Sequence, residues 1–303
     1  MAEQSDGAAA RQRDNYPETT TDPLTPSEPT GVADARTWLF VPGNRPERFE
    51  KARASGADQV ICDLEDAVDP EHKSRARSDV KWWLSHGGVA WVRINGIDTE
   101  WYDHDVSTLS KLAGLRGFVV PKAEVPAALQ SLGRRLGEGR GLVALIETAR
   151  GVHRAYDIAD CDSVDRLAFG SIDFAGDIGA EETDSSLLFA RSTLVMASRV
   201  ADKPAPVDGV TTTLDDPVVL AAAANRAREL GFGGKLCVHP AQLAPVAAAF
   251  QPSAEQIEWA RDILLKAQQS GAGASAAGGQ LIDKPVIERA RRILGRFPGP
   301  AAT

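Results

Sequence analysis

Two acidic residues follow apolar runs of the sequence, in positions that suit a divalent cation. Glu147 comes directly after the run 142–146, and Asp173 lies four residues after Phe169, the last residue of another apolar run. If the two runs are neighbouring strands of one sheet, both carboxylates lie at the same edge. Two hard oxygen ligands, completed by water molecules, suit Mg²⁺. The alternative is that each carboxylate caps the helix after it, a role that Asp fills well.

A single arginine stands at a comparable point. Arg93 follows the run 89–92, whose pattern is that of a half-buried strand. Its planar guanidinium could hold a substrate carboxylate through two parallel hydrogen bonds. The alternative is an ion pair with one of the acids that follow an earlier apolar run, namely Asp63, Glu65 or Asp66.

The remaining residues and motifs narrow the choice of reaction mechanism. His239 precedes Pro240, which indicates that it ends a strand, and it can equally be a packed, hydrogen-bonded histidine. The sequence contains no GxSxG, no GxxxxGK[ST] and no HExxH. These absences argue against acyl-enzyme hydrolysis, nucleotide-driven work and zinc proteolysis.

The elements that must position these residues alternate between short apolar runs and longer helical patterns. Such alternation predicts parallel strands joined by right-handed crossovers. An open doubly wound sheet would show the same alternation, but no run is followed by the GxGxxG of its dinucleotide-binding version. We therefore predict a TIM (β/α)₈ barrel. The expected strands are 37–41, 59–63, 89–94, 117–120, 142–146, 166–169, 205–207 and 235–238. Expected helices include 46–54, 75–84, 126–136, 185–200 and 216–230.

In such a barrel the residues just after each strand share one face, which is where these folds carry their active sites. Polar or ionisable residues occupy nearly all of these positions, and this convergence favours a catalytic site over a solvated surface. The positions are 42–44, 63–66, 93–95, 121–122, Glu147, Asp173, Asp208 and 239–240.

Composition excludes several classes of protein. The chain has 303 residues, of which 34 are Lys or Arg and 42 are Asp or Glu, so the formal net charge is −8. An acidic balance argues against general nucleic-acid binding and against a polybasic membrane surface. No apolar run approaches the roughly 20 residues that span a bilayer. Three scattered cysteines without a CxxC pair predict no disulfide framework or zinc site, and hence a reducing, cytoplasmic setting.

Three segments are expected along the chain. Residues 1–33 are rich in proline and acids and poor in large apolar residues, which predicts a disordered tail. Residues 34–269 form the catalytic barrel. Residues 270–303 begin with a run rich in Gly, Ala and Ser, which predicts a flexible linker before a last helix at about 284–294.

The strand-end motifs resemble those of the citrate lyase β-subunit-like family, within the wider HpcH/HpaI aldolase group. The resemblance runs from about residue 36 to residue 292. It implies a TIM barrel that makes or breaks a carbon–carbon bond next to a coenzyme A (CoA) thioester, uses Mg²⁺, and assembles as a homotrimer or hexamer. The motifs are 39–44 (LFVPGN), 63–68 (DLEDAV), 92–95 (VRIN), 120–124 (VPKAE), 146–149 (IETA), 170–174 (GSIDF), 231–235 (GFGGK) and 238–242 (VHPAQ).

The resemblance also implies residue roles. Glu147 and Asp173 would be the metal ligands, and Arg93 would bind the substrate carboxylate or the keto-acid product. Asp283 resembles an aspartate that family members supply from the C-terminal segment, often from a neighbouring subunit, as general acid or base. Its alternative role is an N-cap, since Pro285 suits the first turn of the final helix. The positions expected to touch the CoA thioester are Phe40, Lys51, Val207 and Asp208.

The expected function is a Mg²⁺-dependent lyase that cleaves a 3-hydroxy-carboxyacyl-CoA such as malyl-, citramalyl- or citryl-CoA. The first alternative is a metal-dependent pyruvate aldolase that acts on free acids. Affinity for CoA separates the two, because a basic helix near the first strand offers phosphate partners, although it could also be a solvated face. The second alternative is a citrate lyase β subunit that depends on a partner protein, and the third is a catalytically silent binding protein. The basic residues are Arg45, Arg48, Lys51 and Arg53.

Overall fold

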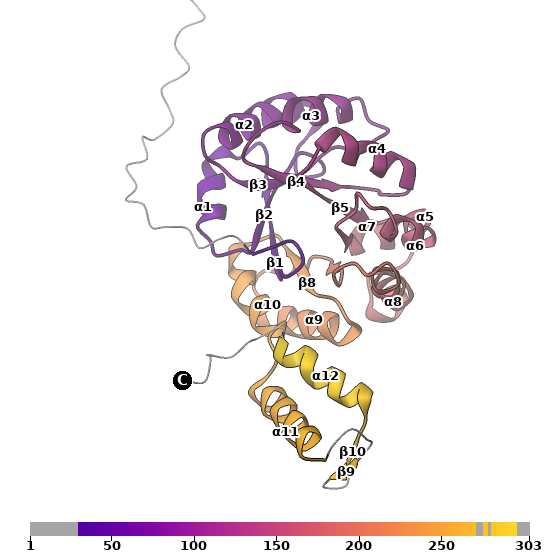
Figure 1. Cartoon of the computed structure of the whole chain (residues 1–303). Coiled ribbons are helices and arrows are strands. Elements are labelled where there is room, and N and C mark those ends of the chain that lie inside the picture. Colours follow the sequence, from indigo (N-terminus) through magenta and orange to yellow (C-terminus); the bar gives the residue numbers. More distant parts are fainter. Residues whose placement is uncertain (1–29, 271–274, 278–279, 296–303) are drawn as a thin grey trace, which may run out of the picture.

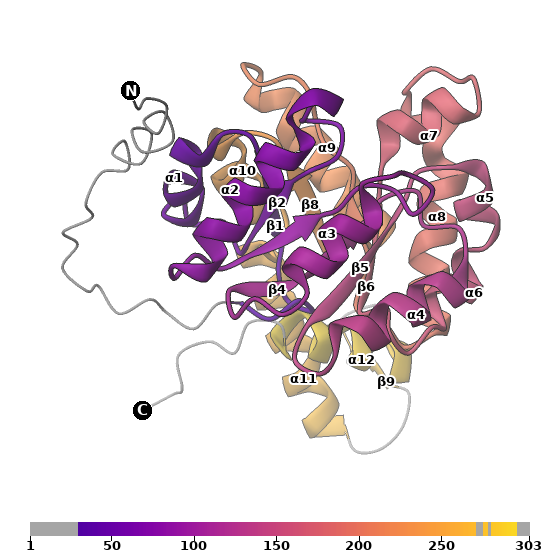
Figure 2. The ribbon, with the colours of Figure 1, turned by 90° about the horizontal axis from the view of Figure 1, so that it is seen from above.

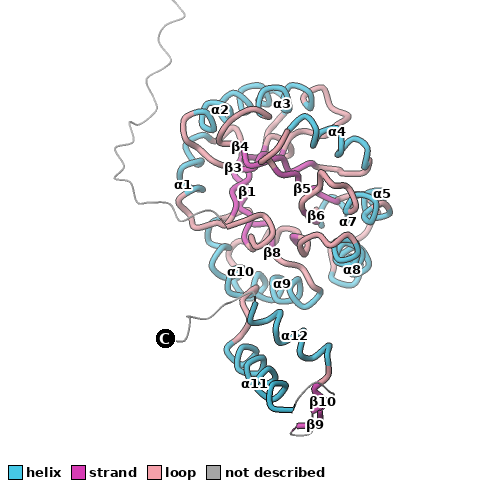
Figure 3. The backbone as a smooth tube through the Cα atoms, viewed as in Figure 1, coloured by secondary structure: helices cyan, strands magenta, loops and turns pink. Residues whose placement is uncertain are grey.

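Eight short stretches of the chain pair side by side and close into a barrel. The computed structural model describes residues 30–270, 275–277 and 280–295. The strands follow one another around the ring in chain order, all parallel, and β8 pairs with β1 to close it (Figures 1 and 3). The predicted TIM barrel is confirmed. The strands are β1 Thr37–Pro42, β2 Gln59–Asp63, β3 Ala90–Arg93, β4 Leu115–Val120, β5 Gly141–Ile146, β6 Arg166–Phe169, β7 Val207–Asp208 and β8 Gly234–Cys237.

Helices occupy the connections between strands, as right-handed crossovers require, and one more follows the last strand; together they form the outer layer (Figure 2). Their bounds are α1 Phe49–Arg53, α2 Lys73–Ser85, α3 Tyr102–Leu109, α4 Pro126–Leu136, α5 Ala149–His153, α6 Ala155–Ala159, α7 Ser171–Asp177, α8 Asp184–Val200, α9 Pro217–Leu230 and α10 Leu243–Ala249. Short 3₁₀ turns precede three of them, at Pro46–Arg48, Pro70–His72 and Pro240–Gln242. In the ranges that the structure describes, no helix is both long and apolar enough to cross a membrane.

The seventh strand differs from its prediction. It was expected at 205–207 and is instead the two-residue β7. The carbonyl of Ala205 accepts a hydrogen bond from Nε of Arg166 at 2.7 Å, and the proline that follows has no N–H for a strand ladder. Val207 nevertheless pairs with β6 on one side and β8 on the other, so the ring stays closed.

Large apolar side chains fill the inside of the barrel. The rings of Trp38 and Trp91 meet there with centroids 5.4 Å apart, and Nε1 of Trp91 donates to Oε1 of Gln59 at 2.9 Å. Gly117 leaves room for this pair, since a Cβ at that position would lie 2.5 Å from the Trp91 ring. The barrel is therefore a packed core and not a pore. The other interior residues include Ile61, Val119, Val143, Leu145, Ala168, Val207 and Leu236.

The first described residues lie across the end of the barrel where the strands begin. Nη1 of Arg166 donates to the carbonyl oxygens of Val32 and Ala35, both at 2.7 Å. Oγ1 of Thr30 donates to Asp58 at 3.2 Å. Most of the segment that was predicted to be disordered, residues 1–29, lies outside the described residues.

The C-terminal segment forms a unit of its own. Helices α11 (Ala254–Ser270) and α12 (Lys284–Gly295) lie outside the ring and pack against each other (Figure 1). They enclose a separate apolar cluster made of Ala260, Ile263, Ile282 and Ala290. The final helix was predicted; the antiparallel strands β9 (Ser275–Ala277) and β10 (Gln280–Ile282) were not. The rest of the expected linker, 271–274 and 278–279, lies outside the described residues, as do residues 296–303.

Candidate active site

A cavity of about 450 Å³ opens at the C-terminal ends of the barrel strands. This is the face where TIM barrels place their catalytic residues. Apolar side chains, including Phe40, Leu145, Phe169 and Leu236, cover part of its wall. The ionisable side chains that line it are Asp63, Asp66, Arg93, Glu147 and Asp173.

Glu147 follows β5 and presents one unused oxygen. Its Oε1 accepts a hydrogen bond from the backbone N–H of Lys122 at 2.8 Å. Its Oε2 is buried and has no hydrogen-bond partner in the described chain. Burial raises the pKa of Glu147 to about 8, the charges of Glu65 and Asp173 add to the rise, and Arg93 and the Lys122 N–H oppose it. A buried carboxylate oxygen without a donor fits a cation as its partner.

Asp173 lies on the first turn of α7, exposed at the cavity. It does not cap that helix, whose N-cap is Gly170 without a side-chain cap bond. Nor does Glu147 cap the helix after it, since Thr148 does so by accepting from the Gly151 N–H at 3.0 Å. The capping alternative therefore fails for both acids.

The rest of the described chain offers no competing metal centre. Within these residues no three His, Cys, Asp or Glu side chains gather closely enough to hold an ion. All three cysteines are buried free thiols. In the cavity itself, Glu147 combines a buried oxygen that has no hydrogen-bond partner among the described residues with a lining shared by Asp173.

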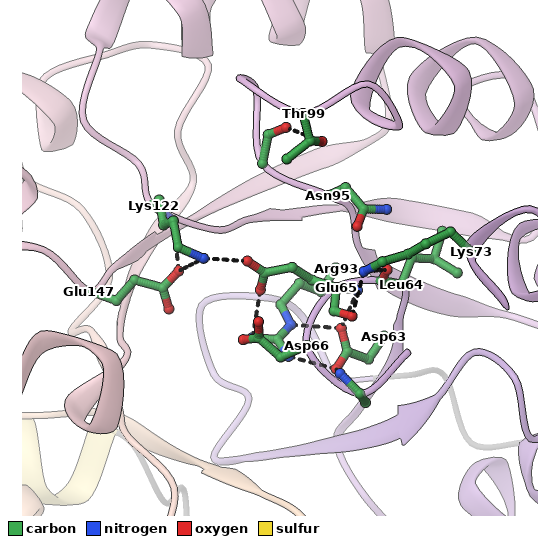
Figure 4. Close-up of polar contacts among 12 residues, drawn as sticks. Asp63, Leu64, Glu65, Asp66, Lys73, Arg93, Asn95, Thr99, Lys122 and Glu147 are labelled. Carbon is green, nitrogen blue, oxygen red and sulfur yellow. Dashed lines mark hydrogen bonds and ion pairs between the residues drawn. The ribbon is translucent and has the colours of Figure 1, made fainter. Parts of the chain in front are cut away.

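Arg93 is surrounded by the three acids that were weighed as its partners (Figure 4). Asp63 takes one edge of the guanidinium, with Nε–Oδ1 at 2.7 Å and Nη2–Oδ2 at 2.6 Å. The remaining nitrogen, Nη1, lies 3.0 Å from Oε2 of Glu65 and 3.3 Å from Oδ2 of Asp66. Burial alone would lower the pKa of Arg93, but the three carboxylates outweigh burial, so the pKa lies above its ordinary value. The ring of Phe40 lies under the guanidinium, 4.9 Å from it.

Lys122 links the two halves of the site (Figure 4). Its φ of +46° is unusual for a residue with a side chain, and from that backbone its N–H reaches Glu147. Its Nζ donates to Oε1 of Glu65 at 2.6 Å and lies 4.0 Å from Oε1 of Glu147. Burial raises the pKa of Glu65 even though Arg93 and Lys122 oppose the shift. From the sequence, Lys122 was expected only among the polar positions after the strand 117–120, and Glu65 only as a possible partner of Arg93. The ion pair between Lys122 and Glu65 was not predicted.

Three of the residues expected to touch CoA lie outside the lining of the cavity. Lys51 is exposed on α1. Val207 is fully buried inside the barrel. Asp208 is buried between Nε of Arg191 at 2.9 Å and Nζ of Lys235 at 3.4 Å. Burial would raise the pKa of Asp208, but these two cations and further hydrogen bonds lower it overall.

Asp283 and His239 both act as caps in this chain. Oδ1 of Asp283 accepts from the Val286 N–H at 3.1 Å at the start of α12, which is the N-cap role weighed as its alternative. Asp283 is not among the residues that line the cavity. Nδ1 of His239 accepts from the Ala241 N–H at 3.1 Å, and the imidazole is exposed.

Comparisons with known proteins point the same way as the motifs. A sequence model of the HpcH/HpaI aldolase/citrate lyase family matches residues 36–240. The citrate lyase subunit beta-like protein of Deinococcus radiodurans is 36% identical over 276 residues, covering 86% of this chain and 96% of that protein. The L-malyl-CoA/beta-methylmalyl-CoA lyase of Cereibacter sphaeroides is 31% identical over 312 residues, covering 90% and 96%.

A solved structure agrees. Protein CitE from Mycobacterium tuberculosis, in complex with magnesium, acetoacetate and coenzyme A, superimposes with a TM-score of 0.78. It shares 33% sequence identity and covers 88% of this chain and 99% of its own. The expectation of a lyase is thus confirmed at the level of the family: the chain belongs to the HpcH/HpaI aldolase/citrate lyase family.

Proposed function

We propose that this chain is a Mg²⁺-dependent lyase that cleaves a carbon–carbon bond of a 3-hydroxy-carboxyacyl-CoA such as malyl-, citramalyl- or citryl-CoA. The products are a short acyl-CoA and a keto acid. The observation that carries the proposal is the buried Oε2 of Glu147, which has no hydrogen-bond partner in the described ranges and shares one cavity with Asp173 and Arg93. The malyl-CoA lyase among the relatives, and the magnesium and CoA in the CitE structure, support it.

Glu147 and Asp173 would hold the Mg²⁺ ion. Carboxylate oxygens are the ligands that Mg²⁺ prefers, and the Lys122 N–H already fixes the orientation of Glu147. Bound there, the ion supplies Lewis-acid stabilisation of negative charge that develops on oxygen, worth several kcal/mol.

The side chains of the cavity would orient the substrate. Arg93 can offer Nη1 to the substrate carboxylate, because Asp63 already occupies its other edge. The apolar wall near Leu145 and Leu236 excludes water from the reacting carbons. As the bond breaks, its electron pair stays on the acyl-CoA as an enolate, and the hydroxyl proton leaves to form the keto acid. An acid then returns a proton to the enolate carbon.

Asp283 is the proposed acid, and its position constrains how it acts. It caps α12 outside the cavity of its own chain. We therefore propose that a neighbouring subunit of a homo-oligomer, a trimer or hexamer in the cytoplasm, brings its Asp283 to this site.

The CoA moiety would lie beside the first strand and helix of the barrel, β1 and α1. Phe40 lines the cavity, and Lys51 projects from α1 beside three arginines that can meet phosphates. Val207 and Asp208 are buried and do not line the cavity, so their assignment to the thioester rests on the resemblance of the sequence alone.

Incubation of the purified protein with malyl-, citramalyl-, methylmalyl- and citryl-CoA tests the proposal. With Mg²⁺ present we expect release of acetyl-CoA or propionyl-CoA from at least one ester, and EDTA should abolish it. Chromatography of the CoA species measures the products. Cleavage that persists in EDTA would contradict the metal assignment.

The outcomes of that assay separate the alternatives. Binding of CoA without cleavage favours a β subunit that needs a partner protein. Neither cleavage nor CoA binding favours a pyruvate aldolase that acts on free acids.

Gly170 offers a graded test of the metal site. A Cβ at this position would lie 2.5 Å from Oε2 and 2.6 Å from Cβ of Glu147. Gly170→Ala must therefore displace Glu147, and we expect about tenfold weaker Mg²⁺ binding by calorimetry and a cost of about 1–3 kcal/mol in stability. Gly176→Ala, inside α7, meets nothing within 4 Å and should keep the Mg²⁺ affinity of the parent, with a stability equal to or slightly above it because alanine favours a helix. Equal Mg²⁺ affinity in the two variants would argue against Glu147 as a ligand.

A further inference from the structure

The guanidinium of Arg93 has one edge that is fixed and one contact that can be exchanged. Asp63 holds the fixed edge through two short hydrogen bonds, and its side chain is only 3% exposed. The same carboxylate accepts from the backbone N–H groups of Glu65 at 2.9 Å and Ala67 at 3.2 Å. Because four donors converge on it, Asp63 cannot leave without breaking the loop after β2.

Asp66 makes the exchangeable contact. Its Oδ2 lies 3.3 Å from Nη1 of Arg93, at the long end of the hydrogen-bond range, and its side chain is 54% exposed. It lines the cavity. Within the described chain its carboxylate has no other hydrogen bond, so rotation toward solvent would cost it little.

Glu65 is a poorer candidate for displacement. Its side chain is 8% exposed, and its Oε1 accepts from Nζ of Lys122 at 2.6 Å. Moving Glu65 would leave a buried carboxylate without a cation and would also break its ion pair with Lys122. Of the three acids around Arg93, only Asp66 combines a single weak contact with a free path to water.

We propose that Asp66 occupies the place on Arg93 that the substrate carboxylate takes, and that substrate binding turns Asp66 out to solvent. The inference rests on the proposed function in one respect, the assignment of Arg93 to a substrate carboxylate. Three acids already surround Arg93, and the carboxylates of Glu147 and Asp173 line the same cavity. Two lysines lie beside these acids: Lys122, which pairs with Glu65, and Lys73, whose Nζ donates to the backbone carbonyls of Leu64 and Glu65. With Arg93 they make three cations against five acids. A fourth carboxylate entering this partly buried site would meet like charges, which favours exchange over addition.

Asp66 then sets the selectivity and the affinity of the site. Every ligand that binds Arg93 must first displace an internal carboxylate. Neutral carbonyl compounds and acids that bind Arg93 weakly therefore do not displace it. Removal of this competitor should tighten the binding of carboxylates, whereas removal of an ordinary binding residue would weaken it. The sign of the effect is therefore diagnostic.

The experiment compares Asp66→Asn and Asp66→Ala with the parent, using pyruvate as the probe in saturating Mg²⁺. We expect the dissociation constant of pyruvate, measured by calorimetry, to fall about two- to fivefold in both variants, as for the loss of one exposed ion pair. The KM of whichever CoA ester the protein cleaves should fall in the same ratio. Asp69→Asn is the matched control, because it removes an equal charge three residues along the chain. The Asp69 side chain is 85% exposed and lies 3.9 Å from His72. The substitution should leave both constants unchanged.

Unchanged or weaker pyruvate binding in both Asp66 variants overturns the inference, and so does an equal gain in Asp69→Asn, which would reveal a general charge effect. The proposed function is judged separately. If esters are cleaved but pyruvate binds no tighter, the lyase assignment stands and the role of Asp66 fails. If pyruvate binds tighter and no ester is cleaved, the role of Asp66 stands and the lyase assignment fails.

Discussion

Glu147→Gln is expected to abolish Mg²⁺-dependent cleavage while the barrel stays folded. The amide keeps the size of the side chain and can still accept from the Lys122 N–H through its carbonyl oxygen. It replaces Oε2, which has no partner among the residues that the structure describes, with a group that does not bind Mg²⁺. Loss of Lewis-acid stabilisation worth several kcal/mol should lower kcat/KM by about three orders of magnitude or more. Calorimetry with Mg²⁺ and steady-state kinetics with the cleaved ester measure the two effects.

The stability of the metal-free variant checks that the loss is chemical and not structural. Burial raises the pKa of Glu147 from 4.5 to about 8, so the folded state holds this proton more tightly than the unfolded state does. The free energy of unfolding of the parent should therefore fall as pH rises from about 4.5 to about 8, by an amount on the order of 4 kcal/mol. Glu147→Gln removes this dependence. At pH 8 the variant should be the more stable protein in EDTA.

A control separates Glu147 from acids in general. Glu50→Gln changes a half-exposed glutamate on α1 that accepts from Nε1 of Trp83 and lies outside the cavity lining. It should keep both Mg²⁺ binding and turnover. Turnover in Glu147→Gln within tenfold of the parent would contradict the metal assignment.

The barrel was predictable because its information is local. Each strand is a short apolar run with a helical pattern on either side, and parallel pairing follows from that alternation without knowledge of any long-range contact. The convergence of Glu147, Asp173 and Arg93 followed in turn, since the topology brings the ends of parallel strands to one face.

The partners of Arg93 were left open for a physical reason. Whether its guanidinium meets a substrate or Asp63 depends on how the loop after β2 folds back. That fold depends on two backbone N–H groups that bind the Asp63 carboxylate. Such bonds are set by individual dihedral angles, and the left-handed φ of Lys122 is a further example. Neither leaves a periodic signal in the sequence.

Asp208 illustrates the same limit over longer distances. Its carboxylate is neutralised by Arg191 from α8 and Lys235 from β8, 17 and 27 residues away. A resemblance of sequence can mark the position, but it cannot say that two cations enclose the side chain. The C-terminal unit is a similar case, because its apolar cluster joins residues on either side of the linker, such as Ile263 and Ile282.

Arg93→Ala is expected to lower the free energy of unfolding by about 3–5 kcal/mol at neutral pH. The substitution leaves Asp63 buried beside Glu65 without their shared cation, and an uncompensated buried charge costs far more than the intact pair contributes. The free energy of unfolding of Arg93→Lys should lie between those of Arg93→Ala and the parent. An ammonium keeps the charge but cannot bond to both Asp63 oxygens along one edge. Urea unfolding measures the differences. Arg48→Ala, at a site whose side chain is 59% exposed, should change stability by less than about 0.5 kcal/mol.

A double-mutant cycle shows whether the cost belongs to the pair. In an Asp63→Asn background Arg93→Ala removes a cation that no longer neutralises its main partner. The loss of stability should then shrink by roughly 1–3 kcal/mol, because contacting members of one ion-pair network are not additive. Additive losses would mean that Arg93 stabilises the barrel by packing on Phe40, which lies 4.9 Å beneath it, and not by holding Asp63. If the losses are not additive, Asp63 is what keeps Arg93 in place for a substrate. Every variant that loosens Asp63 should then also raise the KM of the cleaved ester.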